Sequence, residues 1–152
     1  MALDVTREIT IAAPREQVWA YLIDFPRHPE WSTPSHNLRI SPPAQVRAGA
    51  TFSSIGRDEG RDAQNEVTIT ELVPARRIAF NATMDVGTEW RNAYELSDAG
   101  SGTRVTKDVG LIRGPFLRSL LLRILAPLIK GEEVKVLDGD LARLKERVEG
   151  LT

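Results

Sequence analysis

Asn92 and Tyr94 are the side chains of this sequence best placed to do chemistry on a bound molecule. They lie two residues apart in the segment 89–96, next to Trp90. Because side chains alternate along a β-strand, both point to the same side. The amide and the phenol can orient a carbonyl or hydroxyl group, or serve as oxyanion partner and proton donor. The alternative is that both hydrogen-bond neighbouring strands or ordered water.

Lys107 is a third polar side chain on an apolar strand face, between Val105 and Val109. A lysine buried in a protein requires a partner. That partner is either an acidic group on a ligand or a carboxylate such as Glu66 or Glu71. The alternative is that Lys107 lies near the strand end and extends its amine to solvent.

His28, Glu30 and His36 form the pattern H-x-E-x5-H, whose residue types are those of metal ligands. Metal ligation needs several converging groups, and a proline-rich turn holds two of these residues. We therefore expect no metal site and interpret His28 as a solvated loop residue. Phe25 and Trp31 are expected to anchor this connector in the core. The alternative places one of the two aromatics at the rim of a pocket.

The elements that carry these residues are predicted to be strands of one sheet. Alternating apolar patterns indicate strands at 3–11, around 38–40, and at 50–57, 66–73, 77–84, 89–96 and 103–111. Ser54 and Arg57 are further polar candidates toward the far end of that sheet. Short links between successive strands favour antiparallel pairing, so we predict an α+β fold with a curved antiparallel sheet of about six to seven strands.

Helices are expected on either side of this run of strands. Two short ones should follow the first strand, with Pro14 in an opening turn and Pro26 ending a helix. A long helix is expected from about residue 114 to about residue 149. Pro127 removes a bond to the Arg123 carbonyl and predicts a kink in it. The acidic residues at 132–133 and 138–140 are interpreted as its solvated face.

A cavity between the sheet and the long helix is predicted from the kink at Pro127 and from Gly131. Gly131 continues the face of Ile124 and Leu128, which is expected to face the sheet, and a residue without a side chain leaves room there. At ~24 cal/mol per Å³, an empty cavity of roughly 500 Å³ would cost about 12 kcal/mol, so it must hold water or a ligand. The alternative is that Gly131 only eases the kink.

The segment 116–130 is unusually rich in leucine. Its simplest interpretation is a core helix. However, Leu122, Leu125 and Ile129 broaden the apolar surface beyond what a single contact requires. The alternative is a membrane-touching gate or a surface for oligomerisation.

Composition excludes several classes of protein. The chain has 152 residues, no cysteine and a net charge of −1, so disulfides and thiolate metal sites are excluded and no attraction to nucleic acid is expected. We expect one domain over residues 1–152. The hydropathy pattern contains neither the apolar run of a signal peptide nor a stretch long enough to span a membrane. We therefore expect a cytoplasmic protein. It contains no nucleotide-binding loop and no metalloprotease motif, so no cofactor is expected.

Four stretches carry a resemblance to a known superfamily: IAAPREQVWAYLIDFPRHPEW, RAGATF, TELVPARRIAF and YELSDAGSGTRVT. They resemble the START-like superfamily, also called SRPBCC or helix-grip, and within it the polyketide cyclase/dehydrase and lipid-transport branch. The resemblance implies a deep pocket between the sheet and a long helix. It implies no catalytic residue, because the matching residues are scaffold residues and the superfamily shares no catalytic motif.

Three functions are left open. The first is binding of a hydrophobic small molecule, a lipid or a polyketide-like compound, with Pro127 and Gly131 letting the helix move over the entrance. The second is a cofactor-free cyclase, aromatase or dehydratase that uses acid/base residues in the same cavity. The third is a protein- or membrane-interaction module, with peripheral membrane contact and oligomeric state unresolved.

The predicted site follows from these observations. Its catalytic residues are unknown, with Tyr94 and Asn92 as the candidates. The expected ligand-binding residues are Phe80, Trp90, Asn92, Tyr94, Lys107, Leu128 and Gly131.

Overall fold

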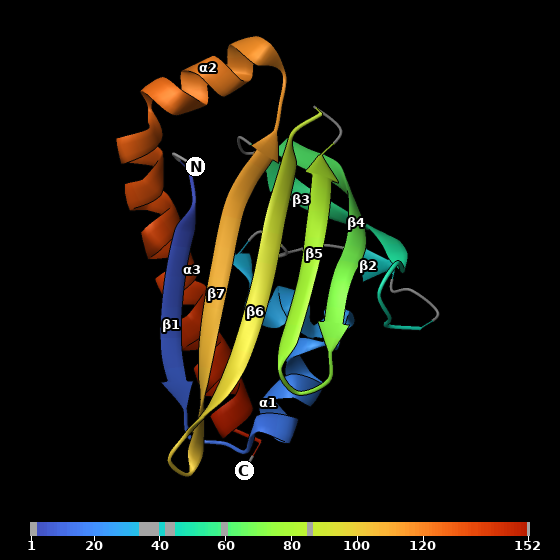
Figure 1. Cartoon of the computed structure of the whole chain (residues 1–152), viewed down its shortest axis with the longest axis vertical. Coiled ribbons are helices and arrows are strands. Elements are labelled where there is room, and N and C mark those ends of the chain that lie inside the picture. The colour runs from blue at the N-terminus through green and yellow to red at the C-terminus, as the bar shows by residue number, and fades with distance from the viewer. Residues whose placement is uncertain (1–2, 34–39, 42–44, 59–60, 85–86, 152) are drawn as a thin grey trace.

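The computed structural model describes residues 3–33, 40–41, 45–58, 61–84 and 87–151. These residues contain one sheet of seven strands in the order β1-β7-β6-β5-β4-β3-β2 (Figure 1). All neighbouring strands are antiparallel. The strands are β1 (Val5–Ile11), β2 (Ile40–Ser41), β3 (Thr51–Asp58), β4 (Arg61–Val73), β5 (Arg77–Met84), β6 (Glu89–Ala99) and β7 (Gly102–Arg113). The predicted α+β class and antiparallel sheet are confirmed.

Three strands are longer than their patterns predicted. β4 begins at Arg61, β6 continues to Ala99 and β7 continues to Arg113. The loop expected after residue 96 shortens to a tight turn, in which Gly100 has a φ of +65°. Glycine adopts this left-handed conformation without steric cost. Of the strand expected around residues 38–40, the structure describes only residue 40 onward.

Two short helices follow β1, as predicted. They are α1 (Arg15–Leu22) and the 3-10 helix η1 (Phe25–Glu30). Pro14 caps α1 at its N-terminal end. Pro26 stands in the first turn of η1 and does not end α1, which already ends at Leu22. Proline is tolerated there because the first turn leaves its N–H positions without helical partners.

The predicted long helix is two helices, α2 (Phe116–Ile124) and α3 (Ala126–Glu149). The expected kink at Pro127 is a complete break at Leu125, two residues earlier. Pro127 lies in the first turn of α3, where its missing N–H removes no hydrogen bond. α2 crosses the top of the molecule between β7 and α3 (Figure 1). No helix within the described ranges has the length and apolar character that a bilayer span requires.

The hydrophobic core lies where α1 and the C-terminal half of α3 pack on the sheet (Figure 1). On α3, Leu141, Leu144 and Val148 are almost fully buried. Before Leu137, the only α3 residue that is buried is Ala126. The half of α3 nearer α2 therefore leaves the space over the sheet incompletely filled by apolar side chains.

Replacing Leu144 by alanine tests this division of α3. Leu144 is completely buried, so Leu144→Ala should lower the free energy of unfolding by about 2–5 kcal/mol in urea denaturation. Leu128→Ala is the control: Leu128 is 68% exposed, so this change should leave the unfolding free energy nearly constant. Equal losses in the two variants would contradict this position of the core.

Candidate functional site

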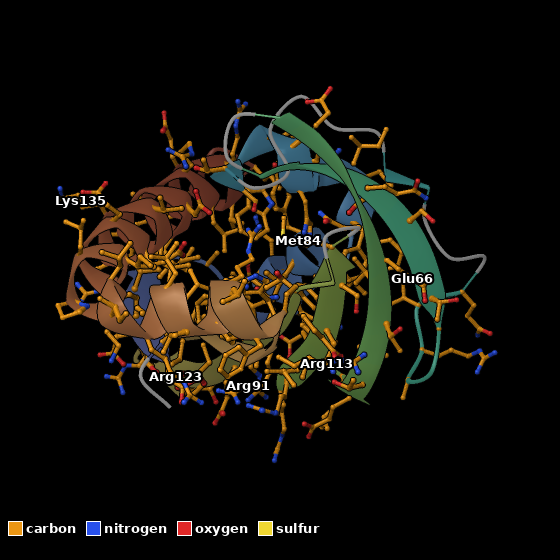
Figure 2. All side chains as sticks on the ribbon, turned by 90° about the horizontal axis from the view of Figure 1, so that it is seen from above. Glu66, Met84, Arg91, Arg113, Arg123 and Lys135 are labelled. Atoms are coloured by element: carbon orange, nitrogen blue, oxygen red, sulfur yellow. The ribbon has the colours of Figure 1, made fainter. Side chains whose placement is uncertain are left out.

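A cavity of about 270 Å³ lies between α3, η1 and the sheet strands β3 to β7. Seen from above, side chains from the sheet and from α3 meet in the space between them, with Met84 among them (Figure 2). Aromatic and aliphatic groups form most of its wall, and several polar groups interrupt that wall. An apolar pocket with a few convergent polar groups is the usual form of a small-molecule site.

The strand register explains which side chains meet in this cavity. Tyr94 on β6 stands directly opposite Lys107 on β7, and Asn92 stands opposite Phe80 on β5. These four residues and Trp90 all line the cavity. The alternation of side chains along the strands, which predicted these five positions, thus places them together. Their contact with a ligand stays a prediction.

Lys107 points into the cavity and is almost completely buried, with 5% of its surface exposed. Its Nζ donates a hydrogen bond to Asn92 Oδ1 at 2.9 Å. The same nitrogen lies 3.9 Å from the centre of the Tyr94 ring and 5.3 Å from that of Phe80. The outward orientation considered for Lys107 is therefore wrong.

The carboxylates expected to pair with Lys107 lie elsewhere. Glu66 is exposed on β4, and Glu71 forms an ion pair with Arg77 at 2.8 Å. Among the described residues, no carboxylate forms an ion pair with Lys107 within 4.0 Å. Removal from water lowers the pKa of Lys107 to about 7, although Asp140, Asp108 and Glu133 act in the opposite direction.

Glu133 and Asp140 on α3 bring two carboxyl groups to the cavity wall. Asp140 is buried and accepts hydrogen bonds from the Thr33 backbone N–H at 3.0 Å and from the Thr33 hydroxyl at 2.6 Å. Burial raises the pKa of Glu133, and the charge of Asp140 raises it further, while Lys107 lowers it. The interpretation of these two acids as part of a solvated face is wrong, whereas Glu132 is exposed as predicted. The spacing of Glu133 and Asp140 places them in line with Leu137 and Leu144, which is the signal that could have found them.

Asn65 is a cavity residue that the sequence analysis missed. Its Oδ1 is buried and has no hydrogen-bond partner. Asn65 precedes the expected start of its strand, and extending the alternation back from Val67 would have found it. Ser54 stands opposite it on β3, also at the cavity wall. The side chain of Arg57, the other candidate on β3, lies outside the described side chains.

His28 is buried, so its interpretation as a solvated loop residue is wrong. Its Nε2 lies 2.7 Å from the Leu22 carbonyl oxygen, which can only accept, so this nitrogen donates. The ring packs between Phe25 and Trp31, with centroid distances of 4.7 and 4.8 Å. Burial lowers the pKa of His28 to about 4, which leaves it neutral at physiological pH.

Phe25 in η1 and Trp31 directly after it explain why His28 is enclosed. Phe25 and Trp31 are almost completely buried, as predicted, and Phe25 also lines the cavity. Glu30 accepts a hydrogen bond from the Tyr21 hydroxyl, and His36 lies outside the described residues. Within the described part of the chain, no three acidic or histidine residues converge as metal ligands.

Leu128 and Gly131 do not line the cavity, contrary to the prediction. Leu128 is 68% exposed. Gly131 is exposed too, and a Cβ added to it would meet nothing within 4 Å. The buried stripe of α3 extends back from Leu137 through Glu133 to Ala126, a phase that leaves both positions outside it. The open space at Gly131 therefore lies outside the cavity, and the movement of the helix over the entrance stays a prediction.

Tyr94 forms a wall of the cavity and is a weak proton donor. It is buried, its ring stacks on Phe80 with the centroids 6.4 Å apart, and it forms a T-shaped contact with Trp31 at 5.9 Å. Burial raises the pKa of its hydroxyl, and the charge of Asp140 raises it further. A phenol with a raised pKa still donates a hydrogen bond, but it gives up its proton less readily.

Known proteins resemble this chain in sequence pattern and in fold. Residues 2–149 match the family described as polyketide cyclase/dehydrase and lipid transport. No curated protein matches significantly.

Solved structures of similar fold include two proteins that the chain matches over nearly its full length. Protein TTHA0849 from Thermus thermophilus is 21% identical, with a TM-score of 0.74 over 98% of this chain and 99% of that one. The Zhui aromatase/cyclase from Streptomyces sp. R1128 is 16% identical, with a TM-score of 0.68 over 96% and 93%.

A third structure is the di-domain ARO/CYC StfQ from the steffimycin biosynthetic pathway. It is 13% identical, with a TM-score of 0.74 over 97% of this chain and 51% of that one. At these identities the likeness to the three structures shows the fold alone. The resemblance inferred from the sequence is confirmed by the family match.

Lys107→Met should change the pH dependence of stability. The folded pKa of Lys107 is about 7 and the ordinary value is 10.5, so between these values the unfolded chain holds a proton that the folded chain lacks. The unfolding free energy of the wild type should therefore rise with pH in this window, by up to about 1.4 kcal/mol per unit, relative to Lys107→Met. Urea denaturation at several pH values measures this difference. Both proteins keep their tyrosines, so a difference that is constant with pH would contradict the burial of a neutral amine.

Proposed function

Since this chain belongs to the polyketide cyclase/dehydrase and lipid transport family, we propose that its cavity binds a small apolar molecule that carries a carbonyl or carboxylate oxygen. The observation that supports this most directly is Lys107, a buried amine with no ion-pair partner among the described residues. A buried charge without a partner is costly, and a ligand oxygen beside Nζ would supply that partner.

Asn92 supports the same oxygen from a second direction. Its Oδ1 accepts the bond from Lys107, which fixes the orientation of the amide and leaves its NH₂ group as a donor. The free Oδ1 of Asn65, two strands away on β4, is an acceptor for a hydroxyl elsewhere on the ligand. The aromatic rings between these polar groups would hold the apolar part of the molecule.

The volume limits the size of the ligand. The volume of about 270 Å³ lies just below the usual range for small-molecule pockets, roughly 300–1,000 Å³. A compound with one or two rings or a short acyl chain fits, whereas a long lipid chain would extend beyond the enclosed space. Water can occupy the cavity between binding events, because its polar groups offer hydrogen bonds. The cytoplasmic location expected from the sequence stays a prediction.

A cyclase or dehydratase activity is the second candidate, and the pair Lys107 and Glu133 favours it. Burial moves the pKa of each group toward neutral pH, downward for the amine and upward for the carboxyl. Such groups exchange protons with a substrate most effectively near their pKa. In this role Glu133 would accept a proton from the carbon beside a ketone, while Lys107 and Asn92 stabilise the enolate oxygen. Tyr94 would then be a positioning residue.

Native mass spectrometry of freshly purified protein tests the binding proposal. The expected result is a retained small molecule with a carbonyl or carboxylate group. Lys107→Met should weaken binding of that compound by about tenfold or more, because a hydrogen bond to a charged group contributes ~1.5–3 kcal/mol. Lys135→Met removes an exposed lysine and should not change binding. Equal affinity in both variants would refute the role of Lys107.

Glu133→Gln and Tyr94→Phe separate binding from catalysis. If the cavity is an active site, Glu133→Gln should abolish turnover of the identified compound while binding persists, since the amide cannot accept the proton. Tyr94→Phe should retain both, because the ring remains. If only Tyr94→Phe loses turnover, Tyr94 and not Glu133 is the acid/base residue. If the wild type binds the compound but does not convert it, the cavity has a binding function and no catalytic one.

A further inference from the structure

The short helix α2 exposes most of its apolar side chains. None of its residues is buried. Its less exposed positions are Arg118, Leu122 and Ser119, whose hydroxyl donates to the Gly114 carbonyl at 3.1 Å. The most exposed apolar residues are Phe116 at 79%, Leu117 at 78% and Ile124 at 68%. A soluble helix normally turns that face toward the core.

These residues form one continuous apolar face. We define it as Phe116, Leu117, Leu120, Leu121, Ile124 and Leu128, all more than 40% exposed. Within α2, the spacing of 117, 120, 121 and 124 places these residues on one side of the helix, and Leu128 is exposed just after the break at Leu125, in the first turn of α3. Exposed apolar surface of this kind marks a site of contact with a partner.

The charge around the apolar face indicates the chemistry of that partner. From Val109 to Gly131 the sequence contains Arg113, Arg118, Arg123 and Lys130 and no acidic residue, and Arg113 pairs with Glu89 of β6 at 2.6 Å. The chain as a whole has a net charge of −1, so this concentration of positive charge is local. A second copy of the same face would bring like charges together. An anionic surface with an apolar layer beneath it complements both features.

The position of α2 at one end of the molecule leaves the apolar face accessible. α2 lies at the top of the molecule, bridging the ends of β7 and α3 (Figure 1). From above it lies along one edge, with Arg91, Arg113 and Arg123 spaced along that side (Figure 2). The cavity residues Trp90 and Glu133 come from the same ends of β6 and α3. A flat surface could therefore approach this end without displacing the core.

We propose that the apolar face of α2 and the first turn of α3 is a peripheral docking surface for a bilayer that contains anionic lipids. The helix would lie in the plane of the interface, with leucine and phenylalanine side chains among the acyl chains and the arginines at the headgroups. The inference rests on the exposed face and its charge, and it does not depend on what the cavity binds.

Sedimentation with lipid vesicles tests the proposal. The intact protein should bind vesicles of phosphatidylcholine with phosphatidylglycerol and should bind pure phosphatidylcholine vesicles more weakly. High salt should weaken the anionic case, because it screens the arginines. Leu117→Ser should reduce partitioning about tenfold through the loss of one inserted leucine. Leu151→Ser, which changes a leucine 55% exposed at the other end of α3, should have no effect.

Reversing the charge of single arginines is a second test of the same proposal. Arg123→Glu should reduce binding to anionic vesicles by at least about fivefold, while Arg104→Glu, an exposed arginine near the opposite end of β7, should not. Unfolding midpoints of all variants, measured in urea, verify that each is folded. Absence of vesicle binding by the wild type would overturn the proposal. So would undiminished binding by Leu117→Ser, or a dimer in sedimentation velocity that Leu117→Ser dissociates without any vesicle binding.

Discussion

The burial of one lysine amine against two aromatic rings is the constraint on which the rest of the site depends. Water stabilises an ammonium far more than a hydrocarbon interior does, so Lys107 can stay inside only where dipoles and rings replace that solvation. Asn92 supplies the dipole, and Tyr94 with Phe80 supplies the rings. The carboxyl groups of Glu133 and Asp140 oppose the loss of charge from farther away. The polar part of the cavity is thus one coupled system, and a change in any member alters the protonation of the others.

Two structural features create the space for that system. The sheet alternates its side chains so that one face carries rings and amides, and α3 packs tightly on it only beyond Leu137. Tight packing at that end is enough to hold the helix, because Leu141, Leu144 and Val148 are almost fully buried. The other end of α3 can then carry polar groups that a packed core would exclude. One half of α3 thus stabilises the fold, and the other half borders the cavity.

Local patterns predicted most of the fold, and five of the seven residues expected at the site line the cavity. Alternation along β5, β6 and β7 identified Phe80, Asn92 and Lys107, since that period is a property of the backbone itself. The patterns failed where tertiary contacts decide. The burial of His28 depends on two rings that close around it. The break at Leu125 comes two residues before Pro127, which stands in the first turn of a new helix and not inside a kinked one. A helical phase extended across that break assigned Gly131 to the wrong side.

The absence of any buried residue on α2 has a consequence for the way this protein unfolds locally. A helix of nine residues is marginal in water on its own, and this one gives the core no side chain whose removal would leave a void. Its backbone hydrogen bonds can open and re-form at little energetic cost to the sheet. Whether α2 is ordered therefore depends on the surface or molecule that it contacts. The order of the remaining described elements depends on their own packing.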